Sequence, residues 1–110
     1  MGCDCEQNKE QEFTWSGSGL KYAVNMDCDG FDMDEDDWKI TVVRGAKTIE
    51  FTPENAVQGE DGQWYICIDT SLLSPGDAFI IFDAFIPDED FEDGIRHEIK
   101  KYKLTEIKSL

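Results

Sequence analysis

Apolar residues in this chain recur in short runs separated by polar turns, and no segment shows a sustained helical period. The longest run, residues 78–86, is apolar on both alternating faces except at Asp83, which is typical of a central strand covered on both sides. A turn follows from Pro87 to Gly94, and an extended segment restarts at Ile95. The pattern therefore predicts two long strands joined by one acidic turn.

Five shorter strands are predicted before this pair, because polar and apolar positions alternate between turn residues. In one of them Trp38, Ile40 and Val42 share a face, as a strand on a hydrophobic core requires. The five segments cover residues 12–15, 20–25, 38–43, 47–52 and 63–69. With the final pair they indicate an all-β fold, an antiparallel immunoglobulin-like β-sandwich of about seven strands, with a small barrel as the competing arrangement.

The length of 110 residues accommodates one domain with a core of its own. Residues 1–11 are expected to form a flexible N-terminal segment, and residues 12–110 the single β-sandwich domain. No apolar run approaches the ~20 residues of a membrane helix. The first residues show neither the basic region nor the apolar region of an export signal. A cytoplasmic location without membrane contact is therefore expected.

The chain is strongly acidic, with 25 Asp and Glu against 10 Lys and Arg and a formal net charge of −15. Such a surface repels nucleic acid and anionic membranes, so direct binding to either is not expected. The acids are concentrated in residues 27–37 and 88–93, whereas cations gather between Arg96 and Lys108. This asymmetry predicts a polarised surface that could orient the molecule against a partner.

Four cysteines, Cys3, Cys5, Cys28 and Cys67, are present, and free thiols are expected in a reducing cytosol. A zinc site of Cys3, Cys5, Cys28 and His97 lacks the paired spacing that structural zinc sites show. Cys67 lies within a predicted strand, where a buried thiol acting as a small apolar side chain is expected.

Catalytic motifs are not recognisable in the sequence, which contains one histidine and neither a nucleophile elbow, a phosphate loop nor a zinc-protease helix. His97 lies next to Arg96 and Glu98, where a surface or hairpin-pairing histidine is more common than a general base. The protein is therefore not expected to be an enzyme.

The first acidic cluster fits the calcium-loop template D-x-[DN]-x-[DN]-G-x5-E with two substitutions at its ends. The oxygen ligands would be Asn25, Asp27, Asp29, the Phe31 carbonyl and Asp36, a set that a hard cation favours. The flanks are strand-like, so a true EF-hand is not expected. The alternative is a solvated loop whose acids blunt exposed strand edges.

Two further binding functions stay open as alternatives. Trp15, Trp38 and Trp64 beside acidic loops could form a sugar-stacking surface, although core burial is expected for Trp38 and Trp64. A compact acidic protein could also act as a DNA mimic that inhibits a nucleic-acid-binding enzyme.

A family resemblance lies in the second half of the chain. Its distinctive part is the turn Pro-Asp-x-Asp-Phe-x-Asp-Gly-x-Arg at residues 87–96. The segments that carry the resemblance are residues 37–40, 47–51, 64–70, 73–76 and 86–96. They resemble the N-terminal sandwich domain of phage baseplate upper proteins and related small β proteins of tailed phages, prophages and conjugative elements of gut bacteria.

The resemblance implies a non-enzymatic structural or docking module of baseplate or tail-associated type, without a required cofactor. Its partners would be protein subunits of a virion or mobile-element assembly, its location could be virion-associated, and self-association into a homo-oligomer is left open. Besides the loop at 27–37, the expected contact residues lie in the distinctive turn: Asp88, Asp90, Phe91, Asp93 and Arg96.

Overall fold

The computed structural model describes residues 3–7, by their backbone alone, and residues 13–109. It is almost entirely β, which confirms the predicted fold class. The described part contains nine strands and one 3-10 turn: β1 (Cys3–Gln7), β2 (Phe13–Trp15), β3 (Gly19–Cys28), β4 (Trp38–Arg44), β5 (Lys47–Phe51), β6 (Val57–Gln58), β7 (Trp64–Asp69), η1 (Thr70–Leu72), β8 (Gly76–Pro87) and β9 (Ile95–Lys108). Each of the seven predicted strands is present, and β1 and β6 are additional.

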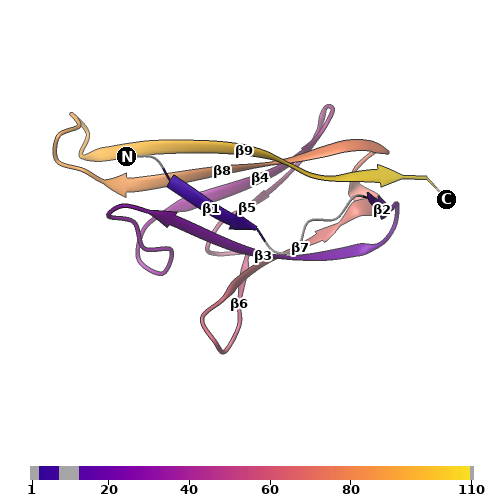
Figure 1. Cartoon of the computed structure of the whole chain (residues 1–110), viewed down its shortest axis with the longest axis horizontal. Coiled ribbons are helices and arrows are strands. Elements are labelled where there is room, and N and C mark those ends of the chain that lie inside the picture. The colour runs from indigo at the N-terminus through magenta and orange to yellow at the C-terminus, as the bar shows by residue number, and fades with distance from the viewer. Residues whose placement is uncertain (1–2, 8–12, 110) are drawn as a thin grey trace.

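The strands form two packed sheets with the orders β1-β3-β7-β6 and β2-β9-β8-β4-β5 (Figure 1). All neighbours are antiparallel except β2, which pairs with β9 in parallel. The first order is the A-B-E-D order of immunoglobulin-type sandwiches, and β9-β8-β4-β5 follows their G-F-C-C′ order. The immunoglobulin-like topology expected from the strand spacing is thus the one observed, and a closed barrel is not formed.

The core lies between the two sheets and contains the face predicted for β4. Trp38, Ile40 and Val42 are buried there, as are Ile66 and Ile68 of β7. Each of these strands alternates buried and more exposed residues, because successive side chains point to opposite faces. For β4, the period-two pattern in the sequence therefore identified the core-facing residues correctly.

The long strand β8 lies between β9 and β4 in its sheet, so the prediction of a central strand is confirmed. The expectation that both of its faces are covered is wrong for the residues that the structure describes. Its inner face, which includes Ile80 and Phe82, is buried against the other sheet, whereas Phe79 and Phe85 on the outer face are partly exposed. The outer face is here defined as the side of this five-stranded sheet that is turned away from β1, β3, β7 and β6.

The N-terminal strand β1 occupies part of the segment that was expected to be flexible. Its backbone pairs with β3 in antiparallel register, with Cys3 opposite Cys28. Residues 8–11 and the side chains of Cys3 and Cys5 lie outside the part that is described.

Two expectations about the cysteines are corrected by the structure. Cys28 is disulfide-bonded, so it is neither a free thiol nor a zinc ligand. The expectation of free thiols rested on an assumed reducing compartment, which the sequence does not establish. Cys67 is exposed rather than buried, because Ile66 and Ile68 occupy the core-facing positions of the alternating strand β7.

No helix in the described part of the chain has the length and apolar character needed to cross a membrane.

Candidate interaction site

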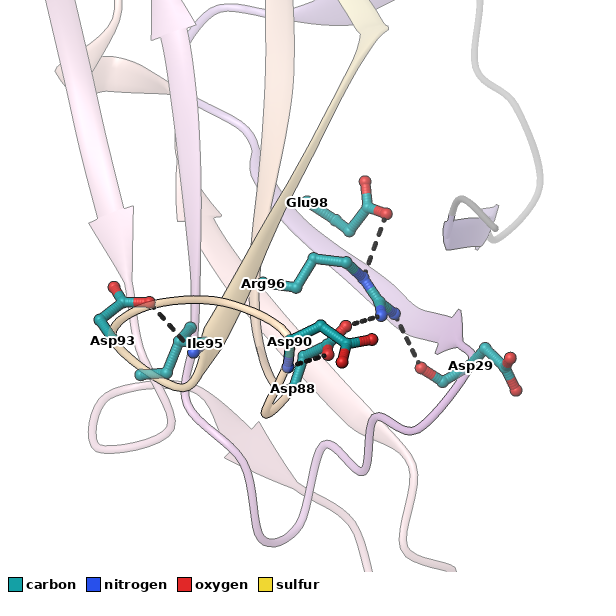
Figure 2. A network of polar contacts seen from close by, with 7 residues as sticks. All are labelled: Asp29, Asp88, Asp90, Asp93, Ile95, Arg96 and Glu98. Carbon is teal, nitrogen blue, oxygen red and sulfur yellow. Dashed lines mark hydrogen bonds and ion pairs between the residues drawn. The ribbon is translucent and has the colours of Figure 1, made fainter.

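The two acidic clusters of the sequence lie at the same end of the sandwich. The loop after β3 begins at Asp29, and the turn between β8 and β9 covers residues 88–94. Arg96 at the start of β9 joins them (Figure 2): its Nη1 donates to Asp88 Oδ2 at 2.7 Å, and its Nη2 donates to the carbonyl oxygen of Asp29 at 3.0 Å. The guanidinium thus links the turn to Asp29, which lies 67 residues from Arg96 in the chain.

The turn between β8 and β9 is ordered by its own polar groups. The Asp88 amide donates to the Gly94 carbonyl at 2.9 Å, and the Asp90 amide donates to Asp88 Oδ1 at 3.0 Å. At the other end the Ile95 amide donates to Asp93 Oδ1 at 3.1 Å. Gly94 has φ +77, a conformation that other residues rarely adopt. Asp88, Asp93 and Gly94 therefore shape the turn.

The hydrogen bonds around Asp88 favour the ionised form of its carboxylate. Hydrogen bonding by the Asp90 amide, and secondly by Arg96, lowers the pKa of Asp88 below its usual value. Arg96 Nε also lies 3.5 Å from Glu98 Oε1 (Figure 2). The contact with Glu98 is an ion pair without a hydrogen bond, whereas the Arg96–Asp88 contact is a charge-assisted hydrogen bond, which is among the stronger kinds in proteins. The end of the sandwich is therefore held in one geometry by a cation between acidic groups.

The remaining residues of the turn face solvent. Glu89, Asp90 and Glu92 are exposed, and Phe91 and Ile95 are exposed by 47% and 42%. Of the predicted contact residues, the structure thus leaves Asp90 and Phe91 available to a partner, whereas the carboxylates of Asp88 and Asp93 are occupied within the turn and Arg96 is occupied between the two loops. The surface combines negative charge with one exposed aromatic ring.

The residues of the predicted calcium loop are placed in two different settings. Asn25 and Asp27 alternate with buried residues on β3 and are exposed. The Asp29 carbonyl accepts from Arg96, Phe31 packs partly against the core, and Asp36 Oδ2 accepts from the Asp32 amide at 2.9 Å.

Within residues 13–109, no group of three or more His, Cys, Asp or Glu side chains is arranged to hold a metal ion. Calcium binding by Asn25, Asp27, Asp29, Phe31 and Asp36 stays a prediction. Calorimetric titration with calcium tests it, and the absence of heat down to millimolar affinity would contradict it.

The loop after β3 is anchored by Asp34, a residue that the sequence did not single out. Its Oδ1 accepts from Trp64 Nε1 at 3.0 Å and from Gln58 Nε2 at 2.7 Å. Trp38 is buried and stands edge-on to Trp64, with its indole N–H donating to the Met33 carbonyl. The tryptophans therefore do not form one sugar-stacking surface, because Trp38 belongs to the core.

His97 pairs with Asp83 across the β8–β9 hairpin. Its Nε2 lies 2.8 Å from Oδ1 of the buried Asp83, and its ring stacks on Phe85 with 4.6 Å between ring centroids. The hairpin-pairing role expected for this histidine is confirmed. The contact also explains the single polar residue in the apolar run of β8, since a buried carboxylate requires a hydrogen-bonding partner.

Comparisons with protein-family models, with curated proteins and with solved structures found no match to this chain. The resemblance to phage baseplate proteins therefore stays a prediction, and the function is argued from the geometry.

Proposed function

We propose that the protein is a non-enzymatic docking module of a phage, prophage or conjugative element, of baseplate or tail-associated type. The observation that carries the docking role is the acidic end of the sandwich, defined as residues 29–37 and 88–94, which Arg96 fixes in one arrangement. A surface that is already ordered loses little conformational entropy on binding, which favours association.

The chemistry of this end specifies the partner. Phe91 is 47% exposed, and its neighbours in the chain, Asp90 and Glu92, are exposed acids. Aromatic residues often supply much of the binding energy at protein interfaces, and charges around them set orientation and association rate. The expected partner is a neighbouring protein subunit whose surface has an apolar pocket surrounded by basic residues. The assignment to a virion or mobile element comes from the family resemblance of the turn at residues 87–96.

The test is capture of subunits from cells in which such an element has been induced. The immobilised protein is compared with a variant carrying Phe91→Ser and Asp90→Lys. Both residues are exposed, and the hydrogen bond of Asp90 in the turn comes from its backbone amide, so the substitutions leave the hydrogen bonds of the turn in place. The proposal expects structural proteins of the element to be retained by the native chain, to be lost with the variant, and to be released as salt rises to about 0.5 M.

A matched control is Val57→Ser in β6, which changes an equally exposed apolar residue of the other sheet. Retention of the same proteins by the native chain and the variant would contradict docking through the acidic end. Retention of proteins unrelated to a virion or transfer machine would contradict the assignment to a mobile element.

A further inference from the structure

The outer face of the five-stranded sheet carries an unusual share of the exposed apolar surface. Seven large apolar side chains are exposed in the described part of the chain, and four of them lie on this face: Phe13, Trp15, Ile95 and Ile99. Phe13 and Trp15 belong to it because Thr14 between them is buried on the inner side. Large exposed apolar patches on soluble proteins mark interaction sites.

Strand pairing makes these side chains part of a continuous stripe. On β8 the partly exposed Phe79, Ile81 and Phe85 point outward between the buried residues of the inner face. Ile99 on β9 pairs with Asp83, and so lies between the positions of Ile81 and Phe85. The stripe therefore runs along β8 and β9, the two longest strands.

Among residues 13–109, the charges on this face balance, unlike those of the chain as a whole. The face carries four lysines, Lys39, Lys101, Lys103 and Lys108. It also carries four carboxylates, Glu50, Asp77, Asp83 and Glu106. Residues 13–109 contain 21 acidic and nine basic side chains, so the excess negative charge of this part of the chain lies outside the face.

Opposite charges on this face are also neighbours. Lys103 lies 3.4 Å from Asp77, Lys39 lies 3.9 Å from Glu50, and the Lys101 ammonium lies 4.8 Å from the centre of the Phe79 ring. A face that is apolar, neutral and composed of alternating signs is complementary to itself. An acidic or basic foreign partner would gain no net charge attraction from it.

The dimensions also fit a two-fold interface. The strands β2, β9, β8, β4 and β5 contain 3, 14, 12, 7 and 5 residues, so at ~3.3 Å per residue and ~4.8 Å per strand the face covers roughly 650 Å². This area falls within the roughly 600–1,000 Å² per partner of standard-size interfaces. Two such sheets can pack face to face as the sheets of a sandwich do.

We propose that the outer face is the interface of a homodimer in which two copies of this chain pack their five-stranded sheets against each other about a two-fold axis. The interface adjoins the acidic end at Ile95, but it does not include Asp90 or Phe91, the residues proposed above to contact another partner. It therefore goes beyond the docking role proposed above and does not depend on it.

The test is the solution mass of the full chain by light scattering after size-exclusion chromatography, loaded from about 1 to about 200 µM. The native chain is expected to shift from one to two chains in this range. Ile99→Lys places a charge in the stripe at a side chain that is 57% exposed, and is expected to raise the dissociation constant at least roughly tenfold. Leu72→Lys in η1, at a side chain that is 58% exposed, is the matched control and should leave the mass unchanged.

Salt distinguishes an apolar interface from a charged one. Raising sodium chloride from about 50 to about 500 mM screens the repulsion between two acidic chains, and should therefore strengthen an interface that is itself neutral. A native chain that remains a monomer at every concentration would overturn the proposal. So would a dimer that Ile99→Lys does not weaken, or one that dissociates as salt rises.

Discussion

The two faces of the five-stranded sheet use similar residues for different purposes. The inner face of β8 places Ile80 and Phe82 in the core at 0% and 1% exposure. The outer face of β8 carries two phenylalanines as well, Phe79 and Phe85, but no second sheet of the described residues covers them. The Lys101 ammonium lies over the Phe79 ring, and the His97 ring stacks on Phe85. Long amphipathic side chains can thus shield an apolar strand that would otherwise require a second layer. An apolar run shows that a face avoids water, and it does not show what covers that face.

The largest difference is expected between two phenylalanines of β8. Phe82→Ala leaves a cavity in the core and should lower the free energy of unfolding by about 3–5 kcal/mol. Phe79→Ala removes a partly exposed ring and should cost about 1 kcal/mol or less. Urea denaturation in dilute solution, followed by tryptophan fluorescence, measures both values. Equal losses would show that the outer face is as well packed as the core.

A smaller difference is expected on β9, where alternate residues belong to the two faces. Arg96→Ala removes the hydrogen bonds to Asp88 and to the Asp29 carbonyl, and should cost about 1–2 kcal/mol after allowance for partial exposure. Lys101→Ala on the outer face removes only a contact with a ring and should cost about 0.5 kcal/mol. Urea denaturation measures the loss in free energy of unfolding for both variants. A larger loss for Lys101→Ala than for Arg96→Ala would refute the role given to Arg96.

Within the outer face, the centre should matter more than the end. Asp83→Ala removes a buried carboxylate that contacts His97 at 2.8 Å, and a loss of about 1 kcal/mol is expected because the histidine keeps access to water. Asp77→Ala removes an exposed ion pair with Lys103 and should cost less than about 0.5 kcal/mol. Thermal unfolding of the two variants gives the comparison, and the reverse order would contradict it.

The smallest effect concerns pH at the acidic end. Because the folded state lowers the pKa of Asp88, this group stabilises the protein above its unfolded pKa, and the contribution is lost as pH falls through the lower folded value. This decrease in the free energy of unfolding is therefore expected below about pH 4. Asp88→Asn should make stability less dependent on pH in that window, as measured by denaturation at several pH values.

Asp69 offers a second site for the same measurement. The hydroxyl and the amide of Ser71 donate to its carboxylate and lower its pKa, so Asp69→Asn should act in the same direction as Asp88→Asn. If both variants kept the pH dependence of the native chain, other groups would have to account for the loss of stability in acid.

Local patterns in the sequence predicted much of the fold, but they predicted the arrangement of the acidic end only in part. The alternation of Trp38, Ile40 and Val42 identified a core-facing strand, and the turn residues Asp88 and Gly94 identified the hairpin. These features depend on neighbours in the chain, which a sequence shows directly. The sequence also singled out Arg96, but its contact with the Asp29 carbonyl depends on how two distant segments are brought together.

The two wrong expectations about cysteines also concern contacts between residues that are distant in the chain or the face of a strand on which a residue lies. The sequence could not show that Cys28 is disulfide-bonded, because bonding depends on a partner in space and on the redox compartment. Burial of Cys67 was expected from its strand, yet an alternating strand has two faces, and the isoleucines beside it took the inner one.

By itself, the sequence determined the class of fold, the positions of seven strands along the chain, the core face of β4 and the strong negative charge, since these depend on composition and on a period of two residues. The tertiary structure alone decided that both acidic clusters meet at Arg96 and that Phe79, Ile81 and Phe85 on the outer face of β8 stay partly exposed in the described part of the chain. Both depend on which strands become neighbours and on how many layers the chain can form, and these are properties of the assembled sandwich rather than of any local segment.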